Sequence, residues 1–282
     1  MSSAARPLPQ FTGDVELRPT FAPRPQITHV VFDFDGTLSW VRHGWPEIMF
    51  GVFGRHLPLQ DEESAQDRTA LFNSIVFGLN GRPTIMQMQR FAEVVKERTG
   101  EELVAEDLRR EFQDELDAEI AARLLSIRSR AVPHDAFVVH AARPLLERLR
   151  ELGIKPIVLS STIEHRVREE AEALDLAQYF GEHIYGSPAD PTAFSKMAVF
   201  QRLLNEEGIQ GEHLLSFGDG PVEISATKEL GGLAIAVCSD EDHNGSGVMD
   251  AFKRRQLLEA GADAALPDFR DAIALVEYLL QK

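Results

Sequence analysis

The stretch THVVFDFDGTLSW, residues 28–40, places two aspartates at the end of an apolar run. Apolar residues occupy positions 30, 31, 32 and 34, and the acids are Asp33 and Asp35. Such a run predicts a buried strand, and a buried carboxylate is strongly unfavourable unless a cation meets it. Two carboxylates this close together also repel each other. The stretch therefore predicts a strand that presents acids to a cation, with further ligands from elsewhere in the chain.

The bulk composition narrows the class of protein. The chain has 282 residues, 44% hydrophobic and 26% charged, so it can form a real core in one large or two modest domains. The net charge of −16 argues against nucleic acids and anionic membranes as partners. A single cysteine, Cys238, excludes an internal disulfide and favours a reducing compartment. Because the chain shows neither a membrane-spanning run nor a signal-peptide pattern, we expect a soluble, cytoplasmic protein.

The first half of the chain contains a leader and a helical segment. Residues 1–26 contain five prolines and predict an extended N-terminal leader, partly disordered or laid along the surface. Residues 40–132 show no convincing strand and carry helical patterns over 61–79, 83–100 and 105–130. The last pattern predicts an apolar stripe made of Leu108, Phe112, Leu116, Ile120 and Leu124.

From residue 133 onward, helices and strands alternate. Strands are expected over 155–161, 183–186, 213–220, 233–239 and 264–266. Helices are expected over 142–153, 163–174, 195–208, 221–230, 250–260 and at the C-terminus. This alternation predicts a parallel sheet with right-handed crossovers. The fold class is therefore α/β, a Rossmann-like parallel sheet core flanked by helices (27–39 and 133–282) with an inserted all-helical domain (40–132).

Polar residues follow four of the predicted strands, where ligands bind in an open parallel sheet. They are Asp33 and Asp35, then Ser160, then Lys196 at the start of a helix, and finally Asp219 and Glu223. The acids Asp33, Asp219 and Glu223 offer the oxygen ligands that Mg²⁺ accepts beside water and phosphate. A carboxylate next to the metal can attack phosphorus, while Lys196 and Ser160 hold the phosphoryl oxygens. Asp35 can then protonate the leaving group and later activate water.

The order of these motifs resembles the haloacid dehalogenase-like (HAD) hydrolase superfamily. DFDGT (33–37) comes first, then a serine at a strand end, then a lysine, and then GDGPVE (218–223). The resemblance extends from residue 28 to about residue 240 and implies that Asp33 is the nucleophile and Asp35 the acid/base. It also implies that the backbone carbonyl of Asp35 joins the Mg²⁺ ligands. The inserted helices are similar to a C1-type cap, which closes over the pocket and selects the substrate.

Two positions leave alternatives open. The second acid of the last motif is more often aspartate in this superfamily, so the longer Glu223 can be a direct or an outer-shell ligand. Three hydroxyl residues follow one another at Ser160, Ser161 and Thr162, so the phosphate-binding hydroxyl can be displaced by one. Ser160 is favoured because it directly follows the apolar run 157–159.

Other residues are expected at the substrate: Gly36, Thr37, Ser161 and Arg82. Gly36 allows the sharp turn that lets Asp35 face the pocket. Arg82 lies in GLNGRPT (78–84), where a C1 cap would present a specificity loop and an arginine could meet an anionic group. An ordinary turn between helices is the simpler interpretation. The segments 40–47 and 239–247 could also line the site, although hinge packing and a surface loop are the simpler interpretations.

We expect a Mg²⁺-dependent phosphatase that acts on a small phosphorylated metabolite through an aspartyl-phosphate on Asp33. A phosphomutase of the same superfamily is the nearest alternative. A phospho-aspartate receiver module belongs to another class, but such modules are typically shorter and lack a helical insert. Dehalogenase chemistry does not need Asp35, and Schiff-base phosphonate cleavage favours a cap lysine near the pocket, whereas Lys96 lies near a helix end. The substrate and the oligomeric state stay open at this level.

Overall fold

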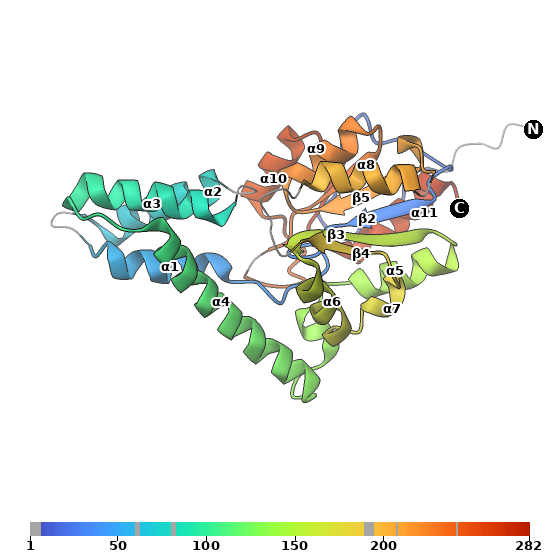
Figure 1. The fold of residues 1–282 in the computed structure, drawn as a ribbon. Coiled ribbons are helices and arrows are strands. Elements are labelled where there is room, and N and C mark those ends of the chain that lie inside the picture. The colour runs from blue at the N-terminus through green and yellow to red at the C-terminus, as the bar shows by residue number, and fades with distance from the viewer. Residues whose placement is uncertain (1–6, 60–62, 80–82, 189–194, 207, 241) are drawn as a thin grey trace, which may run out of the picture. The chain divides into compact units, whose positions relative to one another are not determined.

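The computed structural model describes residues 7–59, 63–79, 83–188, 195–206, 208–240 and 242–282 (Figure 1). The chain divides into two compact units, one of Met1–His43 with Ser126–Lys282 and the other of Gly44–Leu125. Among the described residues, the first unit holds the whole sheet and the second contains only helices. Arg82, which the sequence places at the substrate, lies outside the described residues.

The described part of the first unit forms a seven-stranded sheet in the order β1-β7-β6-β5-β2-β3-β4. The strands are β1 Glu16–Leu17, β2 His29–Phe32, β3 Lys155–Ile163, β4 Ile184–Ser187, β5 Leu214–Gly218, β6 Leu233–Val237 and β7 Ala264–Leu266. Neighbouring strands are parallel, except that β1 is antiparallel to β7. Strand β2 lies between β3 and β5, with Phe32 opposite Val158 on one side and Phe217 on the other.

Helices cover both faces of this sheet (Figure 1). One face carries α8 (Lys196–Glu206), α9 (Pro221–Glu229) and α10 (Ala251–Glu259). The other carries α5 (Ala142–Glu151), α6 (Glu164–Ala173), α7 (Ala177–Phe180) and α11 (Ala272–Leu280). Short 3-10 helices cover His134–Phe137, Gly211–His213 and Phe269–Asp271. Strands covered on both faces need apolar side chains in both directions, which explains the near-continuous apolar runs.

Strand β2 shows this two-sided burial. Val31 belongs to a buried cluster with Phe200 of α8, whereas Phe32 is buried in an aromatic group. The ring of Phe32 stacks on Phe217 with a centroid distance of 5.3 Å and meets the edge of Phe269 at 6.1 Å. Successive residues of one short strand therefore join two separate cores on the two faces of the sheet, which holds the end of β2 in place.

The connections place a switch in strand order beside β2. From β2 the chain proceeds outward to β3 and β4, and it then crosses back to build β5, β6 and β7 on the other side. Ligands of open α/β sheets bind at such a switch, outside the carboxyl ends of the strands. The predicted Rossmann-like α/β fold is confirmed, and the strand predicted over 155–161 continues to Ile163.

The second unit is built from α1 (Trp45–His56), α2 (Ala65–Gly78), α3 (Thr84–Thr99) and α4 (Ala105–Arg128), which runs on into the first unit. Its core contains stacked rings of Phe53 and Phe91, 3.9 Å apart, with the ring of Phe72 edge-on to both. The predicted stripe of α4, from Leu108 to Leu124, is buried as expected. In the described part of the chain, no helix has the length and apolarity that a membrane crossing requires.

The N-terminal leader contributes an edge strand, which the sequence did not predict. Glu16 and Leu17 form β1 on β7. Just before β1, the backbone amides of Thr12 and Gly13 donate hydrogen bonds to the Asp271 carboxylate at 2.8 Å and 2.7 Å. These contacts anchor the leader to the first unit. The sheet therefore has β1 at one edge and β4 at the other.

Candidate active site

Asp33 stands directly after β2 and is held at the switch in strand order. Its amide donates to the carbonyl of Phe217, 3.0 Å away, so the ladder with β5 continues one residue beyond β2. One carboxylate oxygen accepts from the amide of Phe34 at 2.9 Å. The other lies 2.9 Å from the Nζ of Lys196, at the start of α8. The nucleophile predicted from the sequence is thus fixed by backbone and by a buried cation.

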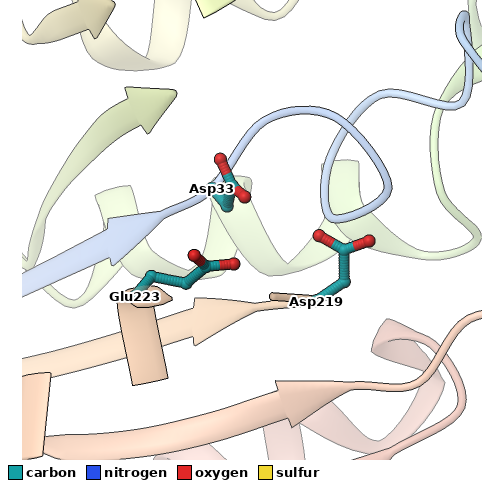
Figure 2. A group of neighbouring side chains, drawn as sticks. All are labelled: Asp33, Asp219 and Glu223. Atoms are coloured by element: carbon teal, nitrogen blue, oxygen red, sulfur yellow. The ribbon is translucent and has the colours of Figure 1, made fainter. Parts of the chain in front are cut away.

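Asp219 and Glu223 approach Asp33 from the neighbouring strand connection, as Figure 2 shows. Asp219 follows β5, and Glu223 lies in the first turn of α9. Glu223 accepts from the amide of Gly220 at 2.6 Å and lies 3.2 Å from the Nζ of Lys196. Asp33, Asp219 and Glu223 each place one carboxylate oxygen within 4.8 Å of the others. Acids predicted from distant parts of the sequence therefore meet at one point.

Gly36 makes the close approach of these segments possible. Its φ is +74°, and a Cβ at this position would lie 2.1 Å from a carboxylate oxygen of Asp219. Any other residue would therefore be strained and would collide with the acid. The hydroxyl of the next residue, Thr37, is buried and donates to Asp219 at 3.3 Å. In this structure Thr37 supports Asp219, and its contact with the substrate stays a prediction.

Two carboxylates, of Asp33 and Glu223, share the single positive charge of Lys196. Burial raises the pKa of Asp33 to about 8, because desolvation outweighs the attraction of the Lys196 ammonium and Glu223 adds repulsion. Burial alone would lower the pKa of Lys196, but Asp33 and Glu223 together hold it above its usual range. A further cation among the carboxylates would therefore favour the ionised form of Asp33.

The donor set suits a divalent cation such as Mg²⁺. Mg²⁺ prefers hard oxygen ligands and usually combines a few carboxylates with water and substrate phosphate. Asp33, Asp219 and Glu223 provide only carboxylate oxygens, and they come from the two strand ends that flank the switch. The charge balance is the second observation in favour of such an ion, because three acids meet where two ammonium groups, of Lys196 and Lys253, are within salt-bridge distance. The residues present therefore fit the metal that the sequence predicts.

Asp35 is held on both of its oxygens. The hydroxyl of Thr162 donates to one of them at 2.7 Å, and the Nε of Arg42 lies 3.0 Å from the other. Arg42 also pairs with the buried Glu170 of α6. Burial raises the pKa of Glu170 to about 7, the Asp35 carboxylate adds to this rise, and Arg42 opposes it. The sequence placed Arg42 in a segment that could line the site but did not identify its partners.

The hydroxyl cluster at residues 160–162 lies where the pairing of β3 with β4 is irregular. The register shifts between Leu159 and Ile163, a local irregularity of the kind that redirects side chains near functional sites. Ser160 is buried, and its oxygen accepts from the amide of Thr162 at 3.0 Å. Ser161 is exposed. Both stay candidates for the phosphate-binding hydroxyl, and Thr162 is engaged by Asp35.

Lys253 of α10 is a site residue that the sequence did not reveal. Its buried Nζ lies 3.2 Å from a carboxylate oxygen of Asp219 and 3.1 Å from the hydroxyl of Ser239. Ser239 in turn donates to the carbonyl of Gly36 at 3.0 Å. Nothing in the local sequence separates Lys253 from a solvated helix lysine, because its partners belong to other strand ends.

Several secondary candidates have local roles in the structure. The ring of His43 stacks on Trp40 with centroids 3.9 Å apart. Asp240 accepts from the backbone of its own loop at Asp242 and His243. Cys238 is buried, and burial raises the pKa of its thiol to about 12, as is typical of an unreactive structural cysteine.

Comparison with known proteins assigns the chain to a family. A family model described as a haloacid dehalogenase-like hydrolase matches residues 27–231. No curated protein matches the chain. Solved structures of other proteins share its fold. A conserved haloacid dehalogenase-like protein of unknown function from Agrobacterium tumefaciens is 17% identical, with a TM-score of 0.60, and the match covers 89% of this chain and 97% of that one.

Two others are also distant in sequence. A predicted phosphoglycolate phosphatase from Haemophilus somnus is 18% identical, with a TM-score of 0.59 and coverage of 89% of this chain and 98% of that one. A Thermotoga maritima protein assigned as a β-phosphoglucomutase is 18% identical, with a TM-score of 0.57 and coverage of 89% and 99%. At these identities the likeness shows the fold alone.

Proposed function

Because the chain belongs to the haloacid dehalogenase-like hydrolases, we propose that it is a Mg²⁺-dependent phosphatase of a small phosphorylated metabolite. The observation that carries this proposal is the meeting of three carboxylates with a buried lysine at the switch in strand order. Asp33, Asp219 and Glu223 would hold the Mg²⁺, together with the backbone carbonyl of Asp35. When bound, the ion would neutralise the charge of the phosphoryl group and of the carboxylates around it.

The first chemical step is a transfer of the phosphoryl group to Asp33. A carboxylate oxygen of Asp33 forms a bond to phosphorus while the bond from phosphorus to the leaving oxygen breaks. Asp35 gives its proton to that oxygen, so the product leaves as an alcohol. Lys196, which lies 2.9 Å from Asp33, would hold one phosphoryl oxygen. Ser160 or Ser161 would hold a second one.

The second step releases phosphate and restores the enzyme. Asp35, now ionised, takes a proton from a water molecule as that water attacks phosphorus. The bond from phosphorus to Asp33 breaks, and inorganic phosphate leaves. We assign the helices of residues 40–132, which contain the second compact unit, as a C1-type cap that selects the substrate, with 27–39 and 133–282 as the catalytic core.

A phosphate-release assay tests this proposal. The wild-type protein should release phosphate from p-nitrophenyl phosphate in the presence of Mg²⁺. The release should stop when EDTA removes the ion. Asp33→Asn should abolish turnover, whereas Asp14→Asn, a matched change at an exposed aspartate, should leave it intact. Full activity in Asp33→Asn would overturn the assignment of the nucleophile.

The same assay separates the alternatives. A panel of sugar phosphates, nucleotides and small organic phosphates should include a substrate that yields free phosphate. A phosphomutase, the activity assigned to the Thermotoga maritima protein of the same fold, is the second candidate. A mutase would convert a sugar phosphate to an isomer without net phosphate release. A receiver module would keep a lasting phosphoaspartate and would not turn over.

A further inference from the structure

Arg42 connects the proposed acid/base to a buried carboxylate that the two chemical steps do not use. Its Nε lies 3.0 Å from Asp35, and its Nη2 lies 2.5 Å from Glu170. Asp35 follows β2, whereas Glu170 belongs to α6, so the arginine joins two separate segments of the first unit. The side chains of Arg42 and Glu170 are 14% and 3% exposed, which means that the pair is largely removed from water.

Thr162 completes this arrangement from the other side. Its hydroxyl donates to Asp35 at 2.7 Å, to the oxygen that Arg42 does not meet. One oxygen of the Asp35 carboxyl group therefore accepts a hydrogen bond from Thr162, and the other forms an ion pair with Arg42. Rotation of the carboxyl group about its terminal bond would break the hydrogen bond, so Thr162 sets the orientation and the charge of Arg42 favours it.

Stability alone does not explain a buried pair at this place. Replacing a buried ion pair by well-packed apolar side chains is often neutral or stabilising, because removing two charges from water offsets their attraction. Such pairs are best understood through what they hold in position. Here the held group is Asp35, and proton transfer depends steeply on the placement of the donor oxygen.

We propose that Arg42 and Glu170 are positioning residues that hold the Asp35 carboxyl group in the orientation needed for proton transfer to the leaving oxygen. Arg42 acts directly on Asp35, and Glu170 acts by fixing the guanidinium group of Arg42. This inference rests on the proposed phosphatase function. It predicts an effect on both proton transfers of Asp35, and the first of them, to the leaving oxygen, can be measured by itself.

Two substrates of nearly equal size expose that step. Phenolate is a poor leaving group and needs a proton as it departs, whereas p-nitrophenolate is stable without one. The ratio kcat/KM reports only the steps up to the release of the leaving group, so hydrolysis of the phosphoenzyme does not enter. Comparing kcat/KM for phenyl phosphate and p-nitrophenyl phosphate therefore isolates the proton transfer by Asp35.

Arg42→Met should lower kcat/KM about 100-fold for phenyl phosphate and less than about threefold for p-nitrophenyl phosphate. Glu170→Gln should show the same selectivity with a loss of about tenfold, because Arg42 is still present but less firmly held. Arg42→Lys should recover only part of the loss, since a single ammonium cannot bridge both carboxylates. Arg148→Met is the matched control, because Arg148 also pairs with two carboxylates, Glu151 and Glu277, but lies outside the site.

Equal losses on both substrates, or no loss on either, would overturn the positioning role. Melting temperatures show whether Arg42→Met folds, and the near-isosteric Glu170→Gln and Thr162→Val keep the test decisive if it does not. Thr162→Val removes the contact to the second oxygen of Asp35 and should show the same preference for the better leaving group. A wild-type protein that hydrolyses neither ester would instead refute the phosphatase proposal itself, and this inference with it.

Discussion

The ammonium group of Lys196 lies 2.9 Å from Asp33 and 3.2 Å from Glu223, with all three side chains almost completely buried. One cation thus serves two acids that come from different strand connections. Asp219 adds a third acid at the same point, and its own lysine partner, Lys253, approaches from α10. Each acid of the site therefore lies beside a lysine. The sign of the change in stability can be predicted for the removal of either partner.

Lys196→Met should destabilise the metal-free protein, because it leaves Asp33 and Glu223 buried without their shared cation. Breaking a buried pair in this way costs about 3 kcal/mol. Urea unfolding in EDTA at pH 7 measures the free energy of unfolding. In an Asp33→Asn background the same substitution should cost clearly less. An identical loss in both backgrounds would show that Lys196 and Asp33 are not coupled.

The stability of the metal-free protein should fall as the pH rises from about 4 to about 8. The folded state raises the pKa of Asp33 from 3.8 to about 8, so in this window it keeps a proton that the unfolded chain has released. This contribution is complete below the unfolded value and is lost as the pH rises through the folded one. Its size is on the order of a few kcal/mol. The unfolding free energies of wild type and Asp33→Asn should agree near pH 4 and separate toward pH 8, where the variant should be the more stable, and parallel curves would contradict the shift.

Gly36→Ala should disable the site, because the new methyl group would lie 2.1 Å from a carboxylate oxygen of Asp219 at a φ of +74°. We expect a loss of about 100-fold in kcat/KM, since Asp219 must move. Gly100→Ala is the matched control, because Gly100 has a φ of +77° but no atom within 4 Å of an added Cβ. It should cost about 1 kcal/mol of stability and leave activity unchanged. Equal activity in the two variants would refute the steric argument.

Lys253→Met should make the protein more dependent on Mg²⁺ for its stability. Without Lys253, which lies 3.2 Å from Asp219, the metal-free form should melt about 5 °C lower, and Mg²⁺ should restore more of that loss than it adds to wild type. Differential scanning fluorimetry with EDTA and with Mg²⁺ measures both values. Lys228→Met is the matched control, since Lys228 pairs with Asp263, a buried acid outside the site. Its melting temperature should fall without any change in the Mg²⁺-dependent shift.

Local patterns in the sequence were sufficient for the fold class and for the acids of the site. The apolar run before Asp33 predicts β2, and the alternation of strands and helices after residue 133 predicts a parallel sheet. The motif residues Asp33, Lys196, Asp219 and Glu223 stand at strand or helix ends, which the sequence marks clearly. These predictions succeed because periodicity and turn chemistry depend on residues that are neighbours in the chain.

The leader and the buried lysine show where such patterns stop. Strand β1 has two residues, too few for any period, and it exists because the edge of β7 was available for pairing. Lys253 has an ordinary helical context, and its burial comes from Asp219 and Ser239. Each partner follows a different strand, so no short segment of the sequence could predict that Lys253 is buried and paired.

By itself, the sequence determined that an α/β sheet forms and which acids and lysine stand at its strand and helix ends, since these follow from local apolar periods and from the ends of strands. Only the tertiary structure decided that β2 lies between β3 and β5 and that Arg42 joins Asp35 to Glu170. The physical reason is that strand order and buried charge pairing are settled by contacts between distant segments. A buried charge persists only where the whole fold brings its partner within a few ångströms.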